Sequence, residues 1–192
     1  SLPWPALLGP VPLVDAQALD ALALQRDLRD VREGHAVFVR GDAARALMIL
    51  VDGQAVVGHA GAGRTLKAER VVHAPGWLDL AAAWGQACFD TDARAQTAAT
   101  VAELPVAPLR ALLAQRPALA LRFVDLLAGE VVRLGGQTHE LMHKDAPARL
   151  AAWLQRQLDG HTHPELRLCE RKRDIASQLG MTPETLSRMM RS

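Results

Sequence analysis

Residues 171–190 read RKRDIASQLGMTPETLSRMM, and this stretch decides the fold of the C-terminal part. Ile175 and Leu179 are four positions apart, so they bury one face of a helix, and the small Ala176 lets a second helix cross closely. Gly180 can adopt the left-handed conformation that ends a helix and turns the chain sharply. The stretch therefore predicts a first helix, a tight turn and a second helix.

The second predicted helix has a well-marked start and two different faces. Thr182 is a good N-cap, and Pro183 suits the first helical position. The apolar side chains expected to face the first helix are Leu186, Met189 and Met190. The opposite face carries, at spacings of three and four, Glu184, Ser187, Arg188 and Arg191. Such a face suits the reading of base edges in a DNA major groove, whereas an ordinary helical hairpin with a solvated face is the alternative.

Basic residues open the first helix. Arg171, Lys172 and Arg173 are candidates for phosphate contacts, or are solvated as the start of a helix. Thr182 and Thr185 add hydroxyl groups to the predicted DNA contacts. The formal net charge is only +1, so the prediction of nucleic-acid binding rests on this local motif and not on overall charge.

The N-terminal half has the pattern of a β domain. Short apolar runs are separated by turn residues, and the expected strands include 36–39, 47–51, 55–57, 71–72 and 94–101. Asp52-Gly53 between two of these runs predicts a hairpin, and regularly spaced short strands predict a sandwich or barrel. A short helix is expected over 13–26, and a short strand over 163–169.

A long helix is predicted from Pro117 to about Lys144. Its seam alternates steps of four and three through Ala120, Val124, Leu127, Val131, Leu134, Thr138 and Leu141. A heptad seam of this length predicts pairing with a second copy, and packing on its own domain is the alternative. Gly135-Gly136 predicts a kink or a close approach of a partner.

Composition limits the class of protein. With 192 residues, of which 49% are hydrophobic, the chain can bury the cores of two small domains. Cys88 and Cys169 are too few for a disulfide scaffold or an all-cysteine four-ligand metal site, and they fit a reducing cytoplasm. We expect no membrane span and no signal peptide, because long apolar runs and a basic, apolar N-terminus are missing.

With these features, the sequence resembles the CRP/FNR family of bacterial regulators over nearly its whole length. The resemblance lies in the Gly-punctuated β half, the RAQTA stretch at 94–98 leading to 101–104, the long helix and the helix-turn-helix. The segment PETLSR at 183–188 is similar to the FNR-type recognition helix. The resemblance implies an α+β protein with a double-stranded β-helix (jelly-roll) sensor and a winged helix-turn-helix. The wing would follow the recognition helix, and the sequence ends at Ser192, just inside that helix.

The domains and partners implied by this resemblance can be stated by residue. Residues 1–116 would form the effector-sensing β-roll, 117–144 the dimerisation helix and 145–192 the DNA-binding domain. The protein would be a homodimeric transcription regulator that binds palindromic double-stranded DNA with TTGAT-like half-sites. Arg188 would contact a guanine and Glu184 a cytosine amino group, with Ser187 on a neighbouring base. RNA polymerase would be a further partner of an activator.

The residues argue against cyclic AMP as the effector. Cyclic-nucleotide members of the family carry a Gly-Glu pair and then an Arg-Ser or Arg-Thr pair, whose Arg binds the cyclic phosphate. Here Asp79 stands in for the Glu, no Arg-Ser follows Phe89, and a buried phosphate would lack its partner. The predicted effector pocket comprises Trp77, Leu78, Asp79, Leu80 and Arg94, although such an aromatic cluster is also typical of a core.

The cysteine-poor, DNR-like branch of the family, which responds to nitric oxide through haem, resembles this chain at PALAL, residues 117–121, and at PETLSR. That resemblance implies haem as a candidate cofactor and the seven histidines as candidate axial ligands.

A second motif favours a different function. His139-Glu140-Leu141-Met142-His143 matches H-E-x-x-H, in which two histidines bind zinc and the Glu acts as a base. No clear third ligand follows, and the motif lies beside the seam of the predicted dimer helix. A non-enzymatic regulator is therefore the preferred interpretation. A zinc-dependent hydrolase, with His139 and His143 as metal ligands, is the alternative.

Overall fold

The computed structural model describes residues 1–24, 28–60, 66–85, 87–158, 168 and 170–191. The strands are β1 Arg29–Val31, β2 Ala36–Phe38, β3 Ala46–Asp52, β4 Gln54–Ala60, β5 Leu66–His73, β6 Gly76–Asp79, β7 Asp92–Ala95 and β8 Ala99–Pro105. The helices are α1 Trp4–Leu8, α2 Leu13–Ala23, α3 Val106–Gln115, α4 Pro117–His143, α5 Ala146–Leu158, α6 Lys172–Gln178 and α7 Pro183–Met189.

The strands form two four-stranded antiparallel sheets, which together are called the β-roll below. One sheet has the order β1-β8-β3-β6 and the other the order β2-β7-β4-β5. β3 pairs with both β8 and β6, so it lies inside its sheet, and its apolar run Ala46–Leu50 is buried throughout. Its best-buried side chains join those of β8 in the core: Leu47, Ile49, Leu50, Val101 and Leu104.

The turn at Asp52-Gly53 is confirmed, but the hairpin predicted around it is wrong. β3 and β4, which flank the turn, belong to different sheets, so the turn carries the chain from one sheet to the other. Gly53 has φ +86, in the left-handed region that favours glycine. A Cβ atom built on Gly53 would lie 2.3 Å from the carbonyl oxygen of Ala98. The turn therefore packs directly against another part of the backbone.

The segment around Ala98 differs from a second expectation, which was a single strand over 94–101. The chain forms β7 and β8 instead, in different sheets, with residues 96–98 crossing between them. The main-chain N–H of Gln96 donates to the carbonyl of Gln54 at 2.8 Å, and the N–H of Gln54 donates to Oγ1 of Thr97 at 3.0 Å. Two crossings between the sheets thus lie against each other and satisfy each other's polar groups.

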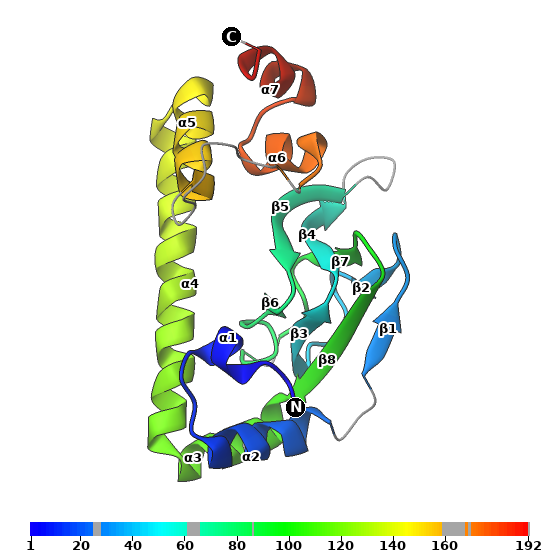
Figure 1. Cartoon of the computed structure of the whole chain (residues 1–192), viewed down its shortest axis with the longest axis vertical. Coiled ribbons are helices and arrows are strands. Elements are labelled where there is room, and N and C mark those ends of the chain that lie inside the picture. Colours follow the sequence, from blue (N-terminus) through cyan, green and yellow to red (C-terminus); the bar gives the residue numbers. More distant parts are fainter. Residues whose placement is uncertain (25–27, 61–65, 86, 159–167, 169, 192) are drawn as a thin grey trace.

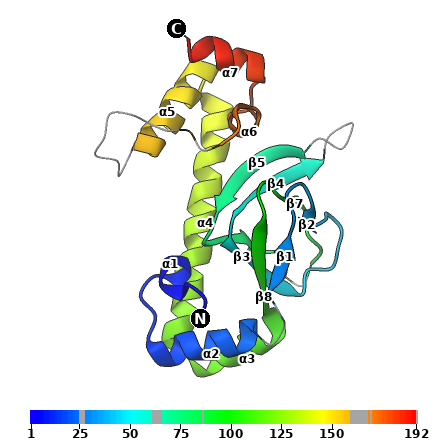
Figure 2. The same cartoon turned by 45° about the vertical axis from the view of Figure 1, so that its right-hand side comes forward.

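The helices surround the β-roll at its two ends and along one side. Figures 1 and 2 show α4 running beside the β-roll, with α2 and α3 at one end and α5, α6 and α7 at the other. The helix expected over 13–26 is α2, which ends at Ala23, and α1 before it was not expected. The strand expected over 163–169 lies almost entirely outside the described residues.

The long helix α4 is uninterrupted at Gly135-Gly136. Cβ atoms built on these two glycines would meet nothing within 4 Å, so this side of the helix has room beside it. The expected α+β fold, with a β-roll, a long helix and a C-terminal helix-turn-helix, is confirmed. Within the described part of the chain, no helix combines the length and the apolar character needed to cross a membrane.

Replacing Gly53 with alanine should destabilise the protein more than the same change at Gly34. Gly34 has φ +80 and open space around its Cβ position, so Gly34→Ala should cost only the left-handed conformation, about 1–2 kcal/mol. Gly53→Ala adds a clash with the 96–98 crossing and should cost about 1–3 kcal/mol more. Urea unfolding followed by circular dichroism measures both. Equal midpoints for the two variants would show that the crossings do not press on each other.

Candidate functional site

The helix-turn-helix packs on a small core of its own. Ile175, Leu179 and Leu186 are almost fully buried between α6 and α7, and Ala176 lets the two helices cross as expected. α5 completes this core with Leu150, Trp153 and the partly buried Leu154. The recognition helix α7 is thus held by apolar contacts on one side only.

The turn between α6 and α7 has the predicted glycine conformation and the predicted N-cap. Gly180 has φ +62, and its N–H donates to the carbonyl of Ser177 at 3.0 Å. Oγ1 of Thr182 accepts the N–H of Thr185 at 3.2 Å, which makes Thr182 the N-cap, and Pro183 occupies the first helical position.

The outward face of α7 is polar and accessible. Glu184 and Arg188 are exposed, and Ser187 and Thr185 are partly exposed. Arg191 is also exposed, but it lies beyond Met190, the C-cap of α7, so the expectation that it shares this helical face is wrong. Hydrogen bonds from its own main-chain N–H and from the Thr182 hydroxyl hold the pKa of Glu184 below its usual value. Glu184 is therefore an ionised acceptor at neutral pH. The structure brings Glu184, Ser187 and Arg188 together on one short helix.

The basic residues at the start of α6 have different surroundings. Lys172 and Arg173 are exposed, and Arg173 lies 3.6 Å from the carboxylate of its neighbour Asp174. Arg171 instead reaches the β-roll, where its Nη2 lies 2.9 Å from Oε1 of Glu33 and 3.3 Å from the carbonyl of Gln96. A predicted phosphate contact is thus already paired with the sensor.

A buried hydrogen bond reinforces this contact between the β-roll and α6. Nε2 of Gln96 donates to Oδ2 of Asp174 at 2.5 Å, and the two residues are only 6% and 3% exposed. A buried carboxylate needs such a partner. Sequence reasoning missed this pair. No sequence signal marked it, because helical spacing places Asp174 away from the face that Ile175, Ala176 and Leu179 share.

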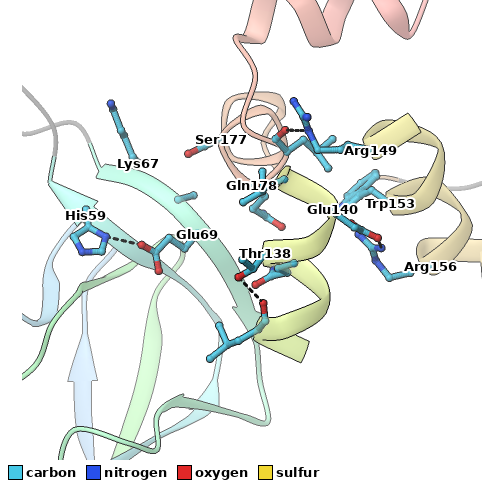
Figure 3. A pocket seen from close by; sticks show the side chains of 15 residues that line it. His59, Lys67, Glu69, Thr138, Glu140, Arg149, Trp153, Arg156, Ser177 and Gln178 are labelled. Atoms are coloured by element: carbon cyan, nitrogen blue, oxygen red, sulfur yellow. Dashed lines mark hydrogen bonds and ion pairs between the residues drawn. The ribbon is translucent and has the colours of Figure 1, made fainter. Parts of the chain in front are cut away.

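A pocket of about 440 Å³ lies where the β-roll meets the C-terminal helices. Figure 3 shows that β5 supplies Lys67 and Glu69, α4 supplies Thr138 and Glu140, and α5 and α6 close the other side. Arg149 of α5 points toward the turn that follows α6.

The H-E-x-x-H motif lies at this joint and does not have the form of a zinc site. Glu140 accepts from Nη1 of Arg156 at 2.6 Å and from Nζ of Lys144 at 3.1 Å, and the Arg156 hydrogen bond is the main cause that lowers the pKa of Glu140. The exposed rings of His139 and His143 have centroids 4.6 Å apart. Among the residues that the structure describes, no group of three His, Cys, Asp or Glu side chains could hold a metal. The hydrolase alternative finds no support.

A larger cavity, of about 620 Å³, lies between the β-roll and α4. It is called the α4 cavity below. Most of its wall is apolar: Val57, Val71, Val72, Trp77, Leu78, Leu80, Ala81, Leu126, Leu127, Val131 and Leu134. Of the predicted effector pocket, Trp77, Leu78, Asp79 and Leu80 line this cavity. Arg94 does not. Its Nη1 donates to the carbonyl of Gly34 at 3.3 Å, and it lines a smaller hollow beside α6.

The two arginines that do line the α4 cavity were not expected from the sequence. Arg70 donates from Nη1 to the carbonyl of Trp77 at 2.9 Å and from Nη2 to that of Leu78 at 2.6 Å, and burial lowers the pKa of Arg70. Arg133 donates to both carboxylate oxygens of Glu130, at 2.8 and 2.6 Å. Both guanidinium groups are therefore engaged by the protein itself.

Carboxylates outnumber these arginines in the wall of the α4 cavity, where Asp79 and Asp90 join Glu69 and Glu130. Burial, and secondly the nearby charge of Asp90, raises the pKa of Asp79, although Asp79 accepts the N–H of Ala82 at 3.0 Å. The described lining holds one histidine, the exposed His73, and neither cysteine nor methionine. His73 is thus the candidate axial ligand in the described lining, and haem as a cofactor stays a prediction.

Two protein families match separate parts of the chain. Residues 28–116 match the cyclic nucleotide-binding domain, and residues 148–192 match the Crp-like helix-turn-helix domain. The first match covers the β-roll with α3, and the second covers the three helices that share the C-terminal core. α4, which joins them, lies between the two matches.

Known proteins resemble the chain as a whole. A CRP-like cAMP-activated global transcriptional regulator of Mycobacterium tuberculosis is 28% identical over 148 residues, which are 73% of this chain and 63% of that protein. The chain thus spans less than two thirds of this relative. A CooA mutant from Carboxydothermus hydrogenoformans has a TM-score of 0.73 at 18% identity, covering 89% of this chain and 77% of that one. DNR from Pseudomonas aeruginosa has a TM-score of 0.51 at 21% identity, covering 95% and 80%.

The two likenesses to solved structures show the fold, and the likeness to DNR does not set that branch apart from others. The order of a cyclic nucleotide-binding β-roll, a long helix and a Crp-like helix-turn-helix is nevertheless present in full in the described residues. The chain belongs to the CRP/FNR family.

Proposed function

We propose that the protein is a sequence-specific, DNA-binding transcription regulator and not an enzyme, acting in the cytoplasm as an effector-controlled homodimer. Residues 1–116 sense the effector, 117–144 dimerise and 145–192 bind DNA, with RNA polymerase as a partner if the regulator activates. The observation that carries the proposal is the recognition helix α7, which is capped, packed on one side and polar on the other.

On DNA, α7 enters the major groove. The guanidinium of Arg188 suits O6 and N7 of a guanine, and the ionised Glu184 suits a cytosine amino group. Ser187 contacts a neighbouring base, and the half-sites resemble TTGAT. Because family members dimerise, two copies of α7 read a palindrome whose half-sites lie about one helical turn apart.

Arg188→Ala should cost about 1–3 kcal/mol of binding and relax the preference at one position of the half-site. Lys172→Ala, the matched control for a phosphate contact, should weaken binding to all sequences alike and lower the salt slope by about one unit. Selection from random DNA, followed by titrations at several salt concentrations, measures both. The proposed reading of α7 fails if the selected site is not palindromic, or if Arg188→Ala leaves every base preference unchanged.

Dimerisation is proposed from the exposed seam of α4. One face of this helix packs on the β-roll through Leu119 and Phe123, whereas Val124, Val131 and Leu141 are each more than half exposed. Apolar side chains in a heptad seam are stable in water only when a partner covers them.

Val131→Asp should weaken dimerisation at least about a hundredfold, because pairing would bury an unpaired carboxylate in each copy at a cost of several kcal/mol. Val132 is the matched control, since it is 75% exposed, against 68% for Val131, but lies off the seam. Val132→Asp should remain a dimer. Sedimentation velocity at micromolar concentration distinguishes the two results. A wild-type monomer, or a Val131→Asp dimer, would contradict the proposed seam.

The effector is proposed to bind in the α4 cavity and not to be a cyclic nucleotide. The guanidinium groups of Arg70 and Arg133 are occupied by carbonyls and by Glu130, and Arg94 lies elsewhere. A cyclic phosphate would therefore enter a largely apolar cavity beside the carboxylates of Asp79 and Asp90 without a vacant cation in the described lining. The M. tuberculosis relative is described as cAMP-activated, so the two proteins would differ in effector.

Calorimetric titration should show no saturable binding of cyclic AMP with a Kd below about 1 mM. The M. tuberculosis regulator, run under the same conditions, provides the positive control. Micromolar binding by this protein would mean that Arg70 or Arg133 leaves its present partners to meet the phosphate. Arg70→Gln and Arg133→Gln, made separately, would then identify which of the two is responsible.

A further inference from the structure

Arg149 on α5 donates hydrogen bonds to three main-chain carbonyls that belong to other segments. Its Nη1 reaches the carbonyl of Lys144 at 2.6 Å, its Nε reaches that of Leu179 at 2.7 Å, and its Nη2 approaches that of Gly180 at 3.4 Å. Figure 3 shows its side chain directed at the end of α6.

These carbonyls lie at the ends of two helices. Lys144 caps the C-terminus of α4, Leu179 caps that of α6, and Gly180 begins the turn into α7. Carbonyls at a helix C-terminus lack partners within the helix and carry the negative end of its dipole. One guanidinium therefore satisfies both helix ends and fixes their distance from each other.

We propose that Arg149 is a positioning residue, which sets the orientation of the recognition helix relative to the dimerisation helix without touching DNA. The inference rests on the proposed DNA-binding function. The planar fork of an arginine holds several donors in fixed directions, whereas a lysine offers one flexible ammonium group. Lysine at this position keeps the charge but cannot hold the two hydrogen bonds to the carbonyls of Lys144 and Leu179 at the same time.

The consequence for DNA binding is specific. A palindrome is read only when both recognition helices of the dimer reach their half-sites together. Loosening the joint between α4 and the α6–α7 turn spreads the orientations of α7, so specific binding weakens. Non-specific binding depends on phosphate contacts, which tolerate such a spread.

Arg156 supplies a matched control on the same helix. It lies seven positions after Arg149, so it is on the same face, and it also bridges α5 to α4 through Glu140 at 2.6 Å. None of its described contacts reaches the α6–α7 turn. Arg156→Lys therefore makes the same chemical change beside the same helix without releasing Leu179.

The experiment compares Arg149→Lys and Arg156→Lys with the wild type, on the selected palindrome and on a duplex of random sequence, at several salt concentrations. Arg149→Lys should lose at least about tenfold in affinity for the palindrome. Its affinity for random duplex and its salt slope should not change. Arg156→Lys should stay within about twofold of the wild type on both DNAs.

Hydrogen exchange of the protein without DNA gives a second, independent measurement. The N–H groups of Gly180 and Met181 donate to carbonyls of α6 at 3.0 Å, so their exchange reports the turn directly. Both should exchange faster in Arg149→Lys and be unchanged in Arg156→Lys. Far-UV circular dichroism fixes a temperature at which all three proteins are folded.

Three results would overturn the inference. A salt slope lowered by about one unit in Arg149→Lys would make Arg149 a phosphate contact. Equal losses on both DNAs would mean that Arg149 does not act through the specific reading of the palindrome. Unchanged specificity together with unchanged exchange would mean that the three hydrogen bonds position nothing. If the wild type itself selects no sequence, the proposed function fails, and the exchange measurement still tests the role of Arg149 in the turn.

Discussion

The packing of Leu119 and Phe123 against the β-roll holds the long helix α4 in place, and the other parts of the molecule depend on where that helix lies. Both side chains are nearly fully buried, and the ring of Phe123 stacks on Trp84 and meets Trp77 edge on. Farther along the helix, α4 closes the α4 cavity, and at its end Glu140 joins it to α5. Val124 and Val131, on the neighbouring face of the helix, are left largely exposed, and Val131 also borders the α4 cavity. A helix with one apolar face on its own domain and another in water is only half packed, which is the physical basis for expecting a second copy.

Local chemistry explains which parts of this arrangement could be predicted from the sequence. The α6–α7 turn depends on Gly180, Thr182 and Pro183, whose conformational preferences act within a few residues, so its structure follows from its sequence. The core positions Ile175 and Leu186 follow from helical periodicity in the same way. The topology of the β-roll does not. Asp52-Gly53 specifies a turn, but whether the next strand pairs with the preceding one or enters the other sheet depends on contacts with residues 96–98.

The polar groups of the α4 cavity, and those between α6 and the β-roll, were even harder to predict from the sequence. Arg94 was part of the predicted pocket, yet β7 directs it away. Arg70, which directly precedes the predicted strand 71–72, lines the α4 cavity instead. Gln96 and Asp174 are 78 positions apart, and only the folded chain brings them together. Hydrogen bonds of this kind leave no periodic signal in a sequence. Helical spacing places Asp174 away from the apolar face of α6, so the sequence does not indicate even that this carboxylate is buried.

The ion pair between Arg171 and Glu33 has a consequence for the ionic atmosphere of the protein. If Arg171 contacts a phosphate in the DNA complex, the carboxylate and the phosphate compete for one guanidinium, so tighter docking of α6 on the β-roll must weaken DNA binding by the same factor. Added salt weakens both interactions. A basic side chain that leaves a carboxylate to bind a phosphate changes the total number of bound counterions only slightly. A basic side chain that was free in solvent before it bound the phosphate changes this number more. Arg171 should therefore contribute less to the salt dependence of DNA binding than Lys172, for which no ion pair is found among the described residues.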